Sequence, residues 1–237
     1  MTEDHAPEPP DKTRGAVILV TVVIFVLMGG AFFFAAVGGP LLGTHKAVRE
    51  FRSDAISGED AVKRLGGPER AAHRLETYLR LPRWMKTDRE AATFLLGDCG
   101  PTAVPALEKA LADPDAAVRY YAAAALGRLG PEAKAAVPAL IKLLADADAN
   151  VRWRAARALG DIGPEAKSAV PALVKALADP DADVRYCAAW ALGDIGPAAK
   201  AAVPALKKVL ENKDEDKAVR DNARWALEKI GGKTGSR

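Results

Sequence analysis

The sequence predicts an all-α protein: an α-solenoid, a superhelix of short helical hairpins, preceded by one transmembrane helix. The tetrapeptide Val-Pro-Ala-Leu recurs with a constant spacing of 33 residues, and residues 15–44 contain no charged side chain. The 237-residue chain is 49% hydrophobic and 27% charged. This composition fits one folded domain with appendages, and it argues against full disorder or several membrane spans.

Residues 16–37 form an uninterrupted run of 22 apolar or small residues near the N-terminus. As a helix this run extends about 33 Å, and the hydrocarbon core of a bilayer is about 30 Å thick. We therefore expect residues 15–39 to be a retained transmembrane helix. The alternative is a cleaved signal peptide, because residues 35–38 are small, but signal peptides have apolar regions of only about 7–15 residues.

The orientation of this span stays open in the sequence. Lys12 and Arg14 directly precede it, and three basic residues follow it between positions 46 and 52. Since a long downstream domain can be translocated whatever its charge, the pattern favours a single-pass membrane protein with a non-cytoplasmic solenoid. Residues 1–14, with three prolines, are expected to be a disordered tail.

The repeats begin with Val-Pro-Ala-Leu, and the units that start at Val137 and Val170 share 24 of 33 residues. Four repeats fill residues 104–231, and a polar insert displaces the second half of the last one by two residues. Residues 40–103 carry degraded copies of the motif, so we expect irregular helical repeats that cap the array. Residues 232–237 are expected to form a disordered tail.

Each unit is predicted to contain two helices. The first starts at Val-Pro, where proline suits the opening turn, and Val137, Leu140 and Leu144 form an apolar stripe along it. A turn with two aspartates follows, and the second aspartate is placed to cap the second helix, which ends at Gly-Pro. In the first repeat the predicted core residues of the second helix are Val118, Ala122, Ala125, Leu126 and Leu129.

Three features of the units resemble HEAT repeats of the short phycobilisome-lyase type. They are Pro-Ala-Leu in the first helix, Asp followed six residues later by the Arg of Val-Arg, and Ala-Leu-Gly near the end of the second helix. The resemblance is strong over residues 104–231 and weak over 58–103. It implies that Asp and Arg bond between adjacent repeats, and that this ladder stops where Arg83 occupies the Asp position. The matching residues are Asp113, Arg119, Asp146, Arg152, Asp179, Arg185, Asp214 and Arg220.

Other functional classes find little support in the sequence. With 34 basic and 31 acidic residues, the net charge of +3 gives no electrostatic case for nucleic acid. The two cysteines and three histidines lack metal-ligand spacing, and no phosphate-binding loop, dinucleotide fingerprint or nucleophile elbow occurs. We therefore predict no catalytic residue, no cofactor and no metal.

The aromatic residues give the most specific signal for function. On a helical wheel each residue is rotated by about 100° from the one before it. With Val118 placed at 0°, the core positions of the second helix fall on one arc, and Tyr120 lies at about 200°, on the opposite side. Five of the eight Tyr and Trp residues fall on this outward face, which the resemblance implies is concave; they are Tyr120, Trp153, Tyr186, Trp190 and Trp225. Because exposed aromatic side chains are enriched at binding hot spots, these five are candidate partner-binding residues. The alternative is that the rings pack between adjacent repeats.

The leading hypothesis is thus a membrane-anchored scaffold that binds a protein or peptide through its second helices, with the membrane contacted by residues 15–39. A second hypothesis comes from the resemblance alone: an enzyme of the bilin-lyase or HEAT-repeat hydroxylase type. The hydroxylase iron site uses His-Glu pairs, and this sequence contains none. A third hypothesis is a purely structural spacer.

Overall fold

The computed structural model describes residues 39–53, 55–79 and 86–232, and the chain divides after His45. Of the part before this point, the structure describes residues 39–45, which begin helix α3 (Gly39–Arg52). The part from Lys46 onward contains the repeats. Within the described residues every regular element is a helix and no strand occurs, as the sequence predicts.

The predicted transmembrane helix, residues 15–39, lies outside the described residues apart from Gly39, as does the predicted tail before it. Among the helices that the structure does describe, none combines the length and apolar character needed to cross a membrane. Of the predicted C-terminal tail only Gly232 is described. The anchor therefore stays a prediction.

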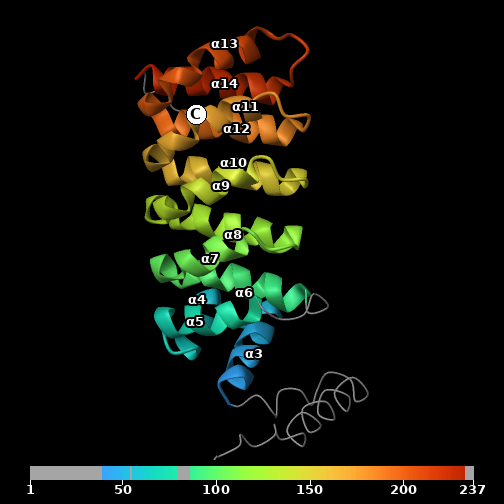
Figure 1. The fold of residues 1–237 in the computed structure, drawn as a ribbon, viewed down its shortest axis with the longest axis vertical. Helices are drawn as coiled ribbons and strands as arrows, with labels where there is room; N and C mark the ends of the chain where they lie inside the picture. Colours follow the sequence, from blue (N-terminus) through green and yellow to red (C-terminus); the bar gives the residue numbers. More distant parts are fainter. Residues whose placement is uncertain (1–38, 54, 80–85, 233–237) are drawn as a thin grey trace, which may run out of the picture. The chain divides into compact units, whose positions relative to one another are not determined.

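The four regular repeats are helical hairpins whose two helices begin where the sequence predicts (Figure 1). The first helices are α7 (Val104–Ala110), α9 (Val137–Leu143), α11 (Val170–Ala176) and α13 (Val203–Glu211). The second helices are α8 (Ala116–Leu129), α10 (Ala149–Ile162), α12 (Ala182–Ile195) and α14 (Lys217–Ile230). Upstream lie α4 (Gly58–Arg64), α5 (Pro68–Leu79) and α6 (Lys86–Asp98).

Aspartate caps start the second helices. The side chain of Asp115 accepts a hydrogen bond from the backbone N–H of Ala117 at 3.0 Å, and Asp148, Asp181 and Asp216 cap their helices in the same way. Such a cap satisfies a backbone donor that has no partner within the helix. The sequence-based prediction of these caps is confirmed.

Three second helices, α8, α10 and α12, end at glycines with positive φ, such as Gly130 at +59°, a conformation that glycine adopts without a Cβ penalty. A 3₁₀ helix, which the sequence pattern does not indicate, then leads to the next repeat. These connectors are η2 (Gly100–Ala103), η3 (Gly130–Ala136), η4 (Gly163–Ala169) and η5 (Gly196–Ala202).

The repeats stack so that their second helices lie side by side in the order α6, α8, α10, α12, α14, while each first helix packs on the second helix of its own repeat (Figure 1). The predicted core residues Val118, Ala122, Ala125 and Leu126 are fully buried in this arrangement. Leu129, in the last turn of α8, stays partly exposed. One hairpin cannot bury both of its apolar faces, so the core exists only because the hairpins stack.

Glycines in the second helices let a tryptophan of the next repeat approach the helix backbone. A Cβ on Gly160 would lie 2.4 Å from Cζ3 of Trp190, and one on Gly193 would lie 2.3 Å from Cζ3 of Trp225. Both distances are far below van der Waals contact, so each ring occupies the space where a side chain would otherwise stand.

A ladder of arginines connects successive repeats. Arg119 donates from Nε and Nη2 to the two carboxylate oxygens of Asp146, each at 2.7 Å, and from Nη1 to the backbone carbonyl of Asp113 at 2.8 Å. Arg152 makes the equivalent pair of bonds to Asp179, at 2.8 and 2.9 Å. Two parallel bonds between a guanidinium and a carboxylate are among the stronger polar contacts in proteins, and they fix orientation as well as distance.

The C-terminal end of the ladder differs from the expectation. Arg185 pairs with Glu215 at 2.8 Å rather than with Asp214, because the insert in the last repeat shifts the turn and brings the longer side chain opposite the guanidinium. Arg220 donates to backbone carbonyls of its own turn, including that of Lys213 at 2.9 Å. At the other end Arg89 of α6 pairs with Asp113, so the ladder reaches the irregular repeat; Arg83 lies outside the described residues.

Two carboxylates of the ladder, Asp146 and Asp179, are stabilised in their ionised form. Burial by itself raises the pKa of Asp146, but hydrogen bonds from Arg119 and from the backbone N–H of Asp148 outweigh this effect and hold the pKa below its ordinary value. The pKa of Asp179 is lowered by the same balance, with Arg152 as its partner.

The Gly–Trp contact leads to a prediction about stability. Gly160→Ala should lower the free energy of unfolding by about 1–3 kcal/mol, because the new methyl group overlaps the ring of Trp190 in a packed interface. In a Trp190→Leu background the same change should cost measurably less, since contacting residues couple by about 0.5 kcal/mol or more. Urea unfolding of the four proteins of this cycle measures both values. Equal losses in the two backgrounds would show that the ring is not what excludes the methyl group.

The ladder leads to a prediction about pH. Asp146→Asn should cost about 2 kcal/mol of stability at pH 7, because it removes a charged acceptor from a largely buried guanidinium. Since the folded-state pKa of Asp146 is depressed, the stabilisation is complete above the unfolded pKa of about 3.9 and is lost as pH falls through the folded value. The difference in melting temperature between wild type and variant should therefore shrink below about pH 4. Glu165→Gln, at an exposed position in η4, serves as the control, and a gap that stays constant down to pH 2 would contradict the assignment.

Candidate protein-binding surface

The five candidate aromatic residues occupy two positions of the repeat. Tyr120, Trp153 and Tyr186 each directly follow a ladder arginine, and all three are partly exposed. Trp190 and Trp225 lie five residues after a ladder arginine, one turn further along the second helix. The structure thus divides the predicted column into two sets with different surroundings.

Trp190 does not project into solvent as predicted, because its ring is buried and only 7% of the residue is exposed. It lies against Gly160 of the preceding repeat, and the guanidinium of Arg157 covers the ring at 3.9 Å from its centroid. Trp225 packs on Gly193 in the same way but stays partly exposed. The prediction was wrong because a helical wheel assumes that a helix has one buried face. In the structure α12 is also covered on its flanks by α10 and α14.

Two residues of the other set, Tyr120 and Trp153, form a contiguous aromatic surface together with Tyr121. The rings of Tyr120 and Trp153 meet edge to face across the α8–α10 boundary, with 5.6 Å between centroids, and Tyr121 contacts Tyr120 at 5.3 Å. Such edge-to-face pairs contribute about 0.5–1.5 kcal/mol beyond the area they bury. Tyr186 lies one repeat further along, on α12.

Sequence reasoning missed several members of this surface. The ring of Phe94 contacts that of Tyr121 at 6.5 Å, and Phe51 stacks on Phe94 at 5.7 Å. Phe94 had a detectable signal, because it lies five residues after Arg89, the position that Trp190 fills in its own repeat. Phe51 comes from α3, outside the repeat pattern, and had none.

Arginines lie against the rings. The guanidinium of Arg154 is 4.6 Å from the centroid of Tyr120 and 4.3 Å from that of Trp153, and Arg128 lies 3.9 Å from that of Phe94. Cation–π contacts of this kind hold both partners in a defined orientation. We call Tyr120, Tyr121, Trp153 and Arg154 the aromatic–arginine patch. Its side chains offer apolar area and hydrogen-bond donors, and this chemistry suits binding.

The two cysteines are free and buried. Burial raises the pKa of Cys99 to about 12 and that of Cys187 to about 11, so both thiols are protonated near neutral pH. A nucleophilic cysteine requires the thiolate, which these environments disfavour. Among the described residues no cluster of three or more His, Cys, Asp or Glu side chains could hold a metal ion.

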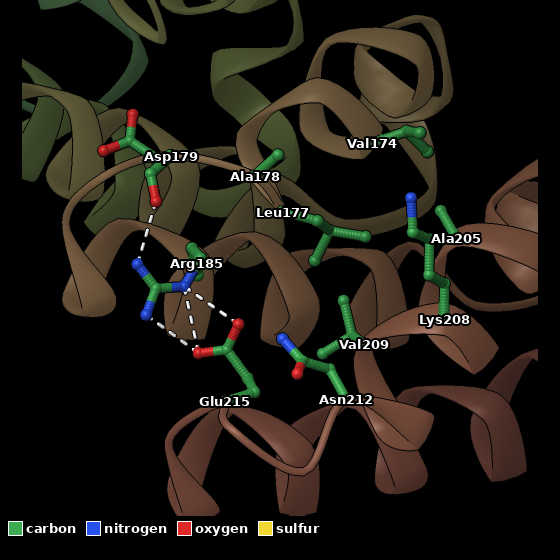
Figure 2. Close-up of a pocket in the computed structure, with 10 residues that line it drawn as sticks. All are labelled: Val174, Leu177, Ala178, Asp179, Arg185, Ala205, Lys208, Val209, Asn212 and Glu215. Atoms are coloured by element: carbon green, nitrogen blue, oxygen red, sulfur yellow. Dashed lines mark hydrogen bonds and ion pairs between the residues drawn. The ribbon is translucent and has the colours of Figure 1, made fainter.

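A separate pocket of about 510 Å³ lies between the third and fourth repeats (Figure 2). Its apolar wall includes Leu177 and Val209, and the Arg185–Glu215 pair of the ladder closes one side. Figure 2 shows the guanidinium of Arg185 between the backbone carbonyl of Asp179 and the carboxylate of Glu215. The ionic groups on that side already bond to each other.

Solved structures with the same fold include engineered proteins and a natural complex. One engineered protein is 27% identical over 80% of this chain and 97% of its own, with a TM-score of 0.53. One chain in the structure of the CpcE–CpcF complex of phycocyanin lyase from Nostoc sp. PCC7120 is 24% identical over 66% of this chain and 97% of its own, with a TM-score of 0.53. A computationally designed armadillo repeat protein for modular peptide recognition is 23% identical over 79% and 99%, also with a TM-score of 0.53.

No curated protein matches the chain. The sequence profile of the family described as HEAT repeats matches residues 85–140 and 137–228, which together cover more than half of the chain. The matched segments contain α6, the first three regular hairpins and all but the last two residues of the fourth, and they include the ladder and the aromatic–arginine patch. The chain therefore belongs to the HEAT-repeat family.

Proposed function

We propose that this protein is a membrane-anchored HEAT-repeat scaffold that holds a protein or peptide segment against the exposed face of its second helices. The observation that carries the proposal is the partly exposed set of rings on successive second helices, Tyr120, Trp153 and Tyr186. Trp, Tyr and Arg dominate binding hot spots, and here arginine lies directly on two of these rings.

The repeat architecture supports the proposal. Neighbouring second helices present the same position at a regular interval, so a bound segment in an extended conformation could contact several repeats in turn. A designed armadillo repeat protein with a similar fold was made for peptide recognition, which agrees with such a role but concerns the fold alone. The lyase alternative likewise rests on a similar fold, and fold does not determine function.

Residues 15–39 would serve as the anchor in this proposal. Their 22-residue apolar run matches the thickness of a bilayer, and a helix of that length satisfies its own backbone hydrogen bonds in lipid. The basic residues around the span favour a solenoid on the non-cytoplasmic side. The scaffold would then hold its partner close to a membrane surface.

Removing two of the partly exposed rings should weaken binding strongly and cost less folding stability than removing a buried ring. We expect Trp153→Ala with Tyr186→Ala to weaken partner capture by about 2 kcal/mol or more, the usual effect of truncating a hot-spot aromatic side chain. The loss of folding stability should be smaller than for a buried ring, which costs about 3–5 kcal/mol when it is replaced by alanine. Quantitative capture from native membranes and thermal melts measure the two effects.

Trp190→Ala is the matched control, because Trp190 is buried between repeats. It should lower the melting temperature strongly, and any loss of capture should follow the loss of folded protein. If the double variant melts as early as this control, the exposed rings belong to the interior packing. If it keeps both its stability and its capture, the second helices do not form the binding face.

Carbonate extraction tests the anchor separately. The full-length chain should remain in the membrane pellet, because the 22-residue apolar helix is expected to be retained after insertion. A variant with Val23→Arg and Phe25→Asp should move to the soluble fraction, since charged residues at the centre of a span cost about 2.5–3.5 kcal/mol each. Recovery of a wild-type soluble form that begins near Gly38 would instead identify a cleaved signal peptide.

A further inference from the structure

Arg154 differs from the other arginines of helices α8, α10 and α12. In the described part of the chain, each of the other five donates to a carboxylate, whereas no carboxylate lies within ion-pair distance of Arg154. Asp161, the carboxylate of the same helix, pairs with Arg157 at 3.4 Å. The five paired arginines are Arg119, Arg128, Arg152, Arg157 and Arg185.

The guanidinium of Arg154 contacts two aromatic rings, and one of its donors, Nε, has no hydrogen-bond acceptor. Its Nη2 donates to the hydroxyl of Tyr120, while its Nε is covered by protein and has no hydrogen-bond partner. Tyr120 and Trp153 lie at 4.6 and 4.3 Å from it and attract its charge through their faces. Removing a cation from water without a counter-charge is unfavourable, and cation–π contacts offset only part of the loss.

The position of Arg154 suits contact with a partner. The residue is partly exposed, as are Tyr120, Tyr121 and Trp153 around it, so an incoming side chain can reach the guanidinium while it packs on the rings. Because Nε is covered, the fork that a partner carboxylate can meet is the one formed by the two terminal nitrogens of the planar guanidinium. The contacts with two rings hold this fork in place before any partner arrives, and such preorganisation reduces the entropy lost on binding.

We propose that the scaffold binds an acidic peptide segment, in which the carboxylate of an Asp or Glu pairs with Arg154 and an adjacent apolar side chain packs on Tyr120 and Trp153. This inference rests on the proposed function and names the chemistry of the partner. A basic segment fits poorly, because a lysine or arginine at this place would face a guanidinium that has no ion-pair partner within the described residues. The charge of Asp161 also acts on Arg154, but that carboxylate pairs with Arg157. The lack of an ion-pair partner thus favours an acidic segment.

The test uses the full-length chain, purified in detergent and probed with an array of random dodecapeptides. Peptides retained by the wild type should be enriched in Asp and Glu next to an aromatic or aliphatic residue. In a fluorescently labelled peptide from this set, changing the acidic residue to its amide should weaken binding about tenfold or more, because one partner of a hydrogen-bonded charge pair is lost. This measurement changes the ligand and leaves the folding of the protein untouched.

Variants of the protein test the same contact from the other side. Arg154→Gln should lose the acidic peptides about tenfold or more, and Arg154→Glu should retain peptides rich in Lys and Arg instead. Arg224→Gln is the matched control, since Arg224 is an exposed arginine of a second helix that pairs with Asp221 within its own helix. It should bind the selected peptides as the wild type does, and circular dichroism verifies that all variants are folded.

The outcomes separate this inference from the proposed function. If the retained peptides depend on Trp153 and Tyr186 but show no excess of acidic residues, the scaffold function stands and the carboxylate partner is refuted. Equal binding by wild type and Arg154→Gln refutes it as well. If no peptide is retained in a way that depends on the aromatic residues, the proposed function fails and the inference fails with it.

Discussion

The contact between an arginine and the next repeat's carboxylate determines the register of the whole array. Arg119 holds the backbone of its own inter-helix turn through Nη1 and the carboxylate of Asp146 through its other two nitrogens. Asp146 in turn accepts the backbone N–H of Asp148, the residue that caps α10. Each arginine–aspartate pair therefore fixes the residue at which the next second helix starts. The packing of a tryptophan ring on a glycine of the preceding second helix requires this starting position to be the same from repeat to repeat.

Much of this fold could be predicted because its signals are local. The Asp caps and the Val-Pro starts act within one or two turns of chain, so the sequence indicated both helices of each regular repeat. Features that depend on the neighbouring repeat were harder to predict. Trp190 looks exposed on a single helix and is buried between two, and the partner of Arg185 changed to Glu215 because an insert altered the path of one turn.

In the candidate site, too, local features could be predicted and contacts between repeats could not. The sequence singled out Tyr120, Trp153 and Tyr186 from the period of one helix, and the structure leaves all three partly exposed. It could not show that Arg154 lies on two of these rings without a carboxylate partner, because both the rings and the possible partners come from more than one repeat. Patterns within a helix thus locate the surface, and contacts across repeats decide its chemistry.

The two buried thiols give two separate regions of the array their own reporters of local opening. Cys99 follows α6 and Cys187 lies in α12, and both are shielded from solvent and protonated in the closed structure. In a solenoid each repeat contacts only its neighbours, so one region can open while the rest stays folded. The rate at which a thiol reagent modifies each cysteine would then reflect the opening of its own repeat. The chain carries, without any substitution, a pair of probes for whether the array fluctuates as one unit or repeat by repeat.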